Sequence, residues 1–159
     1  MQQIMTMDRS LCLDNSMRME FDARSENEGL ARMAVAAFMT PLDPTVGELS
    51  DVKTAVSEAV TNAILHGYEN CEGLVVLQCG LHGDVLCVEI IDEGVGIADI
   101  EQAMQPMFTS KPELNRSGMG FSFMEAFMDD VEVYSQPGLG TTVRMFKKCG
   151  TTPWVEAGE

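Results

Sequence analysis

Hydrophobic and charged residues alternate strictly near the start of the chain. Met17, Met19 and Phe21 are apolar, and each residue between them is charged. Because successive side chains of a strand point to opposite faces, this alternation predicts a half-buried strand. Residues 1–16 lack such a pattern, and we expect them to form a poorly structured N-terminal extension.

A first helix is predicted directly after this strand. Ser25 followed by Glu28 has the spacing of a capping box, in which each side chain binds a backbone N–H at a helix start. Pro41 indicates that the helix ends before it. Five apolar residues share one face of this predicted helix at helical spacing: Leu30, Ala31, Ala34, Val35 and Phe38.

A second helix follows the turn residues Pro44 and Gly47. Gly67 is expected to cap its C-terminus. Its apolar stripe is predicted to comprise Val52, Ala55, Val56, Ala59, Val60, Ala63 and Ile64.

The remaining pattern predicts strands and one more helix. Residues 74–79 and 85–91 are apolar runs around a turn, which indicates a β-hairpin. Residues 97–116 lack periodicity and indicate a loop with at most one short helix, whereas residues 121–128 predict a third helix. Two further strands are expected within 131–148. Together these elements predict one α+β domain over residues 17–148, with a mixed or antiparallel sheet covered by helices on one face, followed by a tail at 149–159.

Composition narrows the classes of partner. The formal net charge of −15 would repel nucleic acid, so we expect no direct nucleic-acid binding and favour a protein partner with basic patches. No apolar run is long enough for a membrane span or resembles a signal peptide, which predicts a cytoplasmic protein without a membrane contact. The five cysteines form no CxxC pair and are interpreted as reduced packing residues.

Two polar side chains on the second predicted helix could carry chemistry. Glu58 and Asn62 are four residues apart and therefore lie one turn apart on the same side, beside the apolar stripe. An amide oxygen can ligate Mg²⁺, and a neighbouring carboxylate can accept a proton from an attacking hydroxyl. Taken alone, Glu and Asn at this spacing more often belong to an ordinary solvated helix face.

Two glycine motifs follow. Asp92 ends an apolar strand and precedes Gly94 and Gly96, so its carboxylate could accept a hydrogen bond from an exocyclic amine while the backbone approaches a ligand closely. A simple glycine turn would look the same. Gly118 and Gly120 lie just before the third predicted helix, where free N–H groups favour a phosphate.

The three motifs occur together in one known superfamily. SEAVTNAILHGY (57–68), DEGVGI (92–97) and RSGMGF (116–121) resemble, in order and spacing, the nucleotide-binding boxes of the GHKL ATPases, the group of gyrase, Hsp90, histidine kinases and MutL. Within that group the segments FDARSENE, FTSKPELNRSGMGF and GTTV are similar to those of the anti-sigma factors of spore-forming bacteria, which are serine-protein kinases. The resemblance covers about residues 17–148 and implies a Bergerat-type ATP-binding sandwich.

The resemblance implies a role for each matching residue. Asn62 would hold Mg²⁺, and Glu58 would be the general base for a serine hydroxyl that attacks the γ-phosphoryl group of ATP. Asp92, helped by Thr141, would bind adenine, and Arg116 would approach the terminal phosphate as a second catalytic residue. The remaining nucleotide contacts would be Gly94, Gly96, Thr109, Ser110, Lys111, Gly118, Met119 and Gly120, although Lys111 fits a solvated loop cation equally well.

The same resemblance implies the partners. A homodimer would bind an RNA polymerase sigma factor and would phosphorylate a serine of the anti-sigma factor antagonist, with ATP and ADP favouring different complexes. Glu28 and Arg32 are candidates for partner contacts, although their spacing also fits a surface ion pair. Three alternatives remain open: a kinase controlling a stress-response sigma factor, the ATP-binding module of a two-component histidine kinase, and a module that binds ATP without transferring phosphate.

Overall fold

The computed structural model describes residues 14–69, 71–104 and 120–150. The elements are, in chain order, β1 (Asn15–Asp22), α1 (Asn27–Phe38), the 3-10 helix η1 (Thr40–Leu42), α2 (Val46–Asn62), the π-helix η2 (Ala63–Gly67), β2 (Leu74–His82), β3 (Val85–Asp92), α3 (Ile100–Ala103), α4 (Gly120–Phe127), β4 (Asp130–Gln136) and β5 (Gly140–Lys148).

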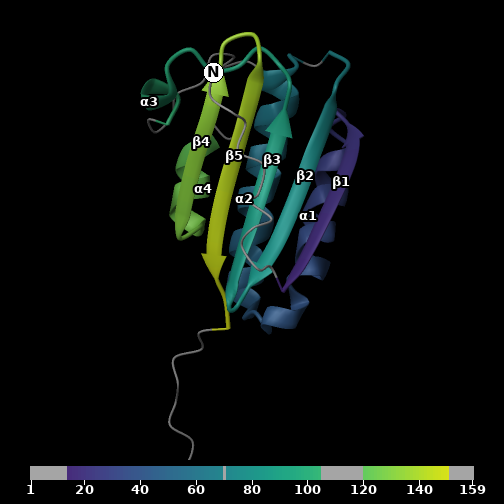
Figure 1. Ribbon diagram of the computed structural model, residues 1–159, viewed down its shortest axis with the longest axis vertical. Coiled ribbons are helices and arrows are strands. Elements are labelled where there is room, and N and C mark those ends of the chain that lie inside the picture. The colour runs from purple at the N-terminus through teal and green to yellow at the C-terminus, as the bar shows by residue number, and fades with distance from the viewer. Residues whose placement is uncertain (1–13, 70, 105–119, 151–159) are drawn as a thin grey trace, which may run out of the picture.

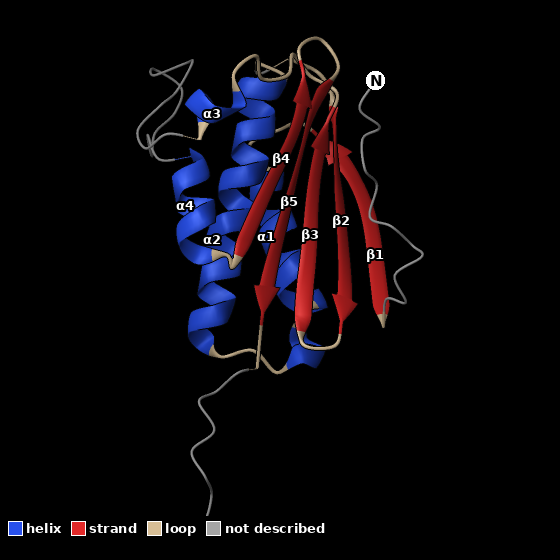
Figure 2. Cartoon of the chain, turned by 60° about the vertical axis from the view of Figure 1, so that its left-hand side comes forward, coloured by secondary structure: helices blue, strands red, loops and turns tan. Residues whose placement is uncertain are grey.

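The five strands form one sheet in the order β1-β2-β3-β5-β4, and every neighbouring pair is antiparallel. Helices α1, α2 and α4 pack on one face of this sheet (Figures 1 and 2). The predicted α+β sandwich is therefore confirmed, and of the two sheet types considered the antiparallel one is present.

The alternation near the start of the chain does form a strand. Phe21 is buried, Met17 and Met19 are half-buried, and the charged residues between them are exposed. The strand begins at Asn15, two residues before Met17, because Asn15 and Ser16 still pair with β2.

Helix α2 lies between α1 and α4 and contacts both. All seven residues of its predicted stripe are buried, from Val52 to Ile64. A capping box fixes its start: the Thr45 side chain accepts from the backbone N–H of Glu48 (3.1 Å), and the Glu48 carboxylate accepts from that of Thr45 (2.8 Å). The central helix thus holds a defined position over the sheet.

Two predicted caps are wrong. The N-cap of α1 is Glu26 in helical conformation, without a side-chain cap. The Ser25 carbonyl already accepts the Glu28 N–H (3.2 Å), so a turn precedes the helix and the capping box does not form. Gly67 is not a left-handed cap either, because it lies inside η2 and its φ is not positive.

Two exclusions drawn from the sequence concern the membrane and the cysteines. Within residues 14–69, 71–104 and 120–150, no helix is long and apolar enough to cross a bilayer. Cys71, Cys79, Cys87 and Cys149 are free thiols, and Cys79 and Cys149 are buried. None of these four cysteines forms a cross-link, and the two buried ones contribute to packing.

Candidate functional site

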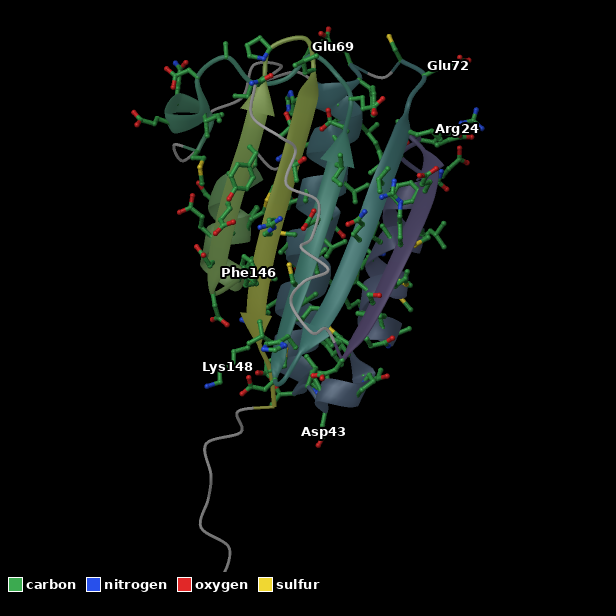
Figure 3. All side chains as sticks on the ribbon, viewed as in Figure 1. Arg24, Asp43, Glu69, Glu72, Phe146 and Lys148 are labelled. Atoms are coloured by element: carbon green, nitrogen blue, oxygen red, sulfur yellow. The ribbon has the colours of Figure 1, made fainter. Side chains whose placement is uncertain are left out.

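Asp92 and Thr141 lie side by side where β3 ends and β5 begins. Glu69 lies near this end of the sheet, and Asp43 and Lys148 lie near the opposite end (Figure 3). Only 5% of Asp92 and 8% of Thr141 is exposed. Paired residues of adjacent strands have side chains on the same face. Asp92 shares its face of β3 with the core residues Ile90 and Val88, so both side chains point to the helix-covered side.

The carboxyl group of Asp92 is kept in an environment of low polarity. Burial raises its pKa from 3.8 to about 6, and hydrogen bonds from the backbones of Gly94 and Thr141 offset part of this effect. The Gly94 N–H donates to Asp92 Oδ1 at 2.9 Å. A buried carboxylate that accepts hydrogen bonds is suited to a neutral donor such as the amine of a purine.

Glycines allow the elements around Asp92 to approach closely. A Cβ at Gly67 would lie 2.8 Å from Asp92 Cγ, and one at Gly94 would overlap the carbonyl of Gly67. At Gly140, where φ is +113°, a Cβ would overlap the Asp92 carbonyl. The absence of side chains at these three positions is therefore a condition for the packing of η2, β3 and β5.

The loop that follows Asp92 is held from two sides. On the helix side, the Val95 N–H donates to the Gly67 carbonyl (2.8 Å) and the Glu93 N–H donates to Tyr68 Oη (2.7 Å). Tyr68 in turn donates to the Leu74 carbonyl (2.6 Å). These bonds fix the loop against η2 and the start of β2.

On the strand side, Ser135 of β4 holds the same loop. Its Oγ accepts the Ile97 N–H (2.7 Å), donates to the Gly140 carbonyl (3.0 Å) and lies 2.8 Å from Thr141 Oγ1. Gly96, with φ of +75°, lies between these anchors and approaches the backbone of Gln136. The loop between Asp92 and Ile97 is therefore fixed on both sides of the site.

Glu58 and Asn62 are half-buried on α2, and Asn62 is its last residue. The next five residues form the π-helix η2, which packs against β3 and β5. Such helices occur frequently at functional sites. The helix that carries the carboxylate and the amide thus ends against the strands that carry Asp92 and Thr141.

The oxygen donors suit a hard cation only in part. Glu58 and Asn62 offer a carboxylate and an amide, both of which are Mg²⁺ ligands. No group of three or more His, Cys, Asp or Glu that could hold a metal exists in the described part of the chain. A Mg²⁺ ion held here would therefore need oxygens from its nucleotide, as is usual for this ion.

The second glycine motif is described only at its end. Gly120 is the first residue of α4, which packs against α2. Six predicted site residues lie outside the described residues, and their roles stay predictions: Thr109, Ser110, Lys111, Arg116, Gly118 and Met119.

The two candidates for partner contacts form the ion pair that their spacing allowed. Arg32 Nη1 lies 3.2 Å from Glu28 Oε1 and 3.5 Å from Ser57 Oγ of α2. Both charged side chains remain partly exposed at the outer surface of α1 and α2. Their role in partner contacts stays a prediction.

Sequence reasoning did not predict Tyr68 and Ser135, whose side chains hold the loop that follows Asp92. Tyr68 is the last residue of the first motif, and its place there could have marked it as a site residue. Ser135 belongs to no local pattern that would distinguish it. A separate hollow of about 800 Å³ lies where β1, α1 and the start of β2 meet, and it is lined by residues 22–26, Ile64 and residues 71–74. It contains none of the predicted site residues, so the end of β3 remains the candidate site.

Comparison with known proteins defines the class. Residues 21–147 match the histidine kinase-like ATPase domain. The anti-sigma F factor of Bacillus subtilis (strain 168) is 57% identical over 136 residues, 85% of this chain and 93% of that protein. Those of Clostridium perfringens (strain SM101 / Type A) and Clostridium beijerinckii are 55% and 59% identical, over 87% and 85% of this chain and 100% and 95% of theirs. The chain belongs to the histidine kinase-like ATPases and, within them, to the anti-sigma F factor family.

Proposed function

We propose that this protein is an ATP-dependent protein-serine kinase that inhibits a sporulation sigma factor and inactivates the antagonist of that inhibition by phosphorylating it. The observation that carries the proposal is the buried Asp92 carboxylate, set against the end of the helix that bears Glu58 and Asn62. The similarity to anti-sigma F factors supports the same assignment.

The nucleotide would bind at the end of β3. The Asp92 carboxylate would accept a hydrogen bond from the exocyclic amine of adenine, and the Thr141 hydroxyl beside it would complete that contact. The glycines at 67, 94 and 140 let η2, β3 and β5 pack closely around Asp92, which fixes the position of the carboxylate that would bind the base. Gly96, Gly118 and Gly120 would shape the remainder of the cleft, with Thr109, Ser110, Lys111 and Met119 as further contacts.

Transfer depends on positioning and charge neutralisation. ATP would supply the γ-phosphoryl group: the serine oxygen would form a bond to the γ-phosphorus, the bond from that phosphorus to the β-phosphate oxygen would break, and ADP would leave. Glu58 would accept the proton of the attacking serine hydroxyl, and Asn62 would hold Mg²⁺ through its amide oxygen. Arg116 would neutralise charge on the terminal phosphate.

The partners would be an RNA polymerase sigma factor and the anti-sigma factor antagonist. The net charge of −15 favours partners with basic surfaces, and Glu28 with Arg32 offers a contact on α1 outside the nucleotide site. ATP and ADP would favour different complexes, because a ligand shifts an equilibrium only through its differential affinity for the two states. We expect these complexes to form in the cytoplasm and the protein itself to be a homodimer.

Labelled ATP and a purified antagonist protein provide the test. Glu58→Gln and Asn62→Ala should both lose phosphate transfer, and nucleotide binding should be better preserved in Glu58→Gln, because it keeps the shape of the side chain. Glu20→Gln, an exposed residue of β1, is the matched control and should transfer at the parental rate. Undiminished transfer by Glu58→Gln would remove the assigned base.

A further inference from the structure

The hydroxyl of Ser135 has three contacts and only one hydrogen. The Ile97 N–H can only donate to Ser135 Oγ (2.7 Å), and the Gly140 carbonyl can only accept from it (3.0 Å). All three contacts have a hydrogen only if that of Ser135 lies on the bond to Gly140. Either oxygen of the third contact, 2.8 Å to Thr141 Oγ1, could be the donor, and in this arrangement the donor is Thr141.

This arrangement decides what Thr141 can offer a ligand. Its one hydrogen is directed at Ser135, so only its lone pairs remain for the site. Asp92, the residue paired with Thr141 across β3 and β5, also offers only lone pairs when it is ionised. Both side chains are almost fully buried, which makes an unpaired acceptor beside another acceptor unfavourable.

We propose that Ser135 is a positioning residue that fixes Thr141 as a hydrogen-bond acceptor, so that the site selects a purine with an exocyclic amine over one with a carbonyl in that place. The inference rests on the ATP site proposed above and names its base specificity. The exocyclic amine of adenine donates its N–H groups to Asp92 and Thr141. Hypoxanthine and guanine carry a carbonyl oxygen at that place, which is a third acceptor beside these two. Without Ser135, the Thr141 hydroxyl can rotate and donate to that carbonyl.

The experiment compares the dissociation constants of ATP and inosine triphosphate, which differ at this position of the base, by calorimetry on the full chain. The variants are Ser135→Ala, Thr141→Val and their double variant. Ser135→Thr keeps the hydroxyl and should restore the parental preference. Ser50→Ala, which removes an exposed hydroxyl of α2, is the matched control.

Ser135→Ala should lower the preference for ATP about tenfold, the size expected for one hydrogen bond exchanged for a mismatch. Added to Thr141→Val, it should change the preference no further, since the two residues act as one unit. If Ser135→Ala does not fold, Ser135→Cys replaces it, because a thiol is a weak donor and should give a smaller drop of the same sign.

If Ser135→Ala weakens the binding of ATP and of inosine triphosphate equally, Ser135 has a purely structural role and the inference is overturned. The same drop in the Thr141→Val background would also overturn it. Absence of ATP binding in the parent protein would overturn the proposed function together with it, whereas intact ATP binding with an unchanged preference would overturn only the role of Ser135.

Discussion

Replacing Asp92 by Asn should make the protein more stable and a worse nucleotide binder. Burial raises the pKa of Asp92 from 3.8 to about 6, a shift of about two pKa units. Each unit corresponds to about 1.4 kcal/mol, so the ionised group costs the native state about 3 kcal/mol at neutral pH. An amide of the same shape carries no charge, and we expect a gain of about 1–3 kcal/mol in the free energy of unfolding.

The pH dependence has a defined sign. Because the folded pKa of Asp92 lies above the unfolded value, the native state takes up a proton as the pH falls through about 6. The contribution of Asp92 to stability is therefore fully present below about pH 4 and is lost as the pH rises through about 6. The advantage of Asp92→Asn should be greatest at pH 7–8 and should vanish near pH 4.

Urea unfolding followed by far-ultraviolet circular dichroism measures this difference across the pH range. Asp130→Asn, at the exposed start of β4, is the control and should change little. The affinity for ATP should fall about 10–100-fold in Asp92→Asn, because a hydrogen bond to a charged acceptor is lost. A variant less stable than the parent at pH 8, or a difference that does not change with pH, would refute the reasoning.

Three further variants test the packing around the site and the sheet. Gly67→Ala should weaken ATP binding and lower stability by about 1–3 kcal/mol, because its Cβ would lie 2.8 Å from Asp92 Cγ; calorimetry and urea unfolding measure both effects. Thr45→Ala should lower the stability by about 1 kcal/mol through loss of the capping box and leave the ATP affinity unchanged. Arg144→Leu should cost about 3–5 kcal/mol, since it leaves the fully buried Glu89 carboxylate without its partner at 3.0 Å, and adding Glu89→Leu should recover most of that loss in the same unfolding assay.

Periodicity was sufficient to predict the main elements. The apolar stripe from Val52 to Ile64, which continues from α2 into η2, follows the 3.6-residue repeat and is buried. The alternation up to Phe21 follows the 2-residue repeat and forms the expected half-buried strand. The first motif placed Glu58 and Asn62 on one helix, and the second placed Asp92 at a strand end. Each of these inferences depends on residues that are close in sequence.

What could not be predicted depends on residues distant in sequence. Ser135 contacts Ile97 across 38 positions, and only the sheet order brings them together. The capping box failed for a different reason: Ser25 and Glu28 have the required spacing, but Ser25 accepts through its carbonyl and the helix begins later. The same spacing at Thr45 and Glu48 does form a box and could have been found. Spacing alone therefore proposes caps without deciding between them.

The π-helix after Asn62 restricts how this protein can be recombined with its relatives. In η2 the Tyr68 N–H reaches back five residues to the Ala63 carbonyl (2.9 Å), one residue more than in an ordinary helix. A graft that lacks this additional residue would turn everything beyond the junction by about 100° about the helix axis. The Tyr68 hydroxyl would then no longer accept the Glu93 N–H. A chimera must therefore exchange α2, η2 and Tyr68 as one segment.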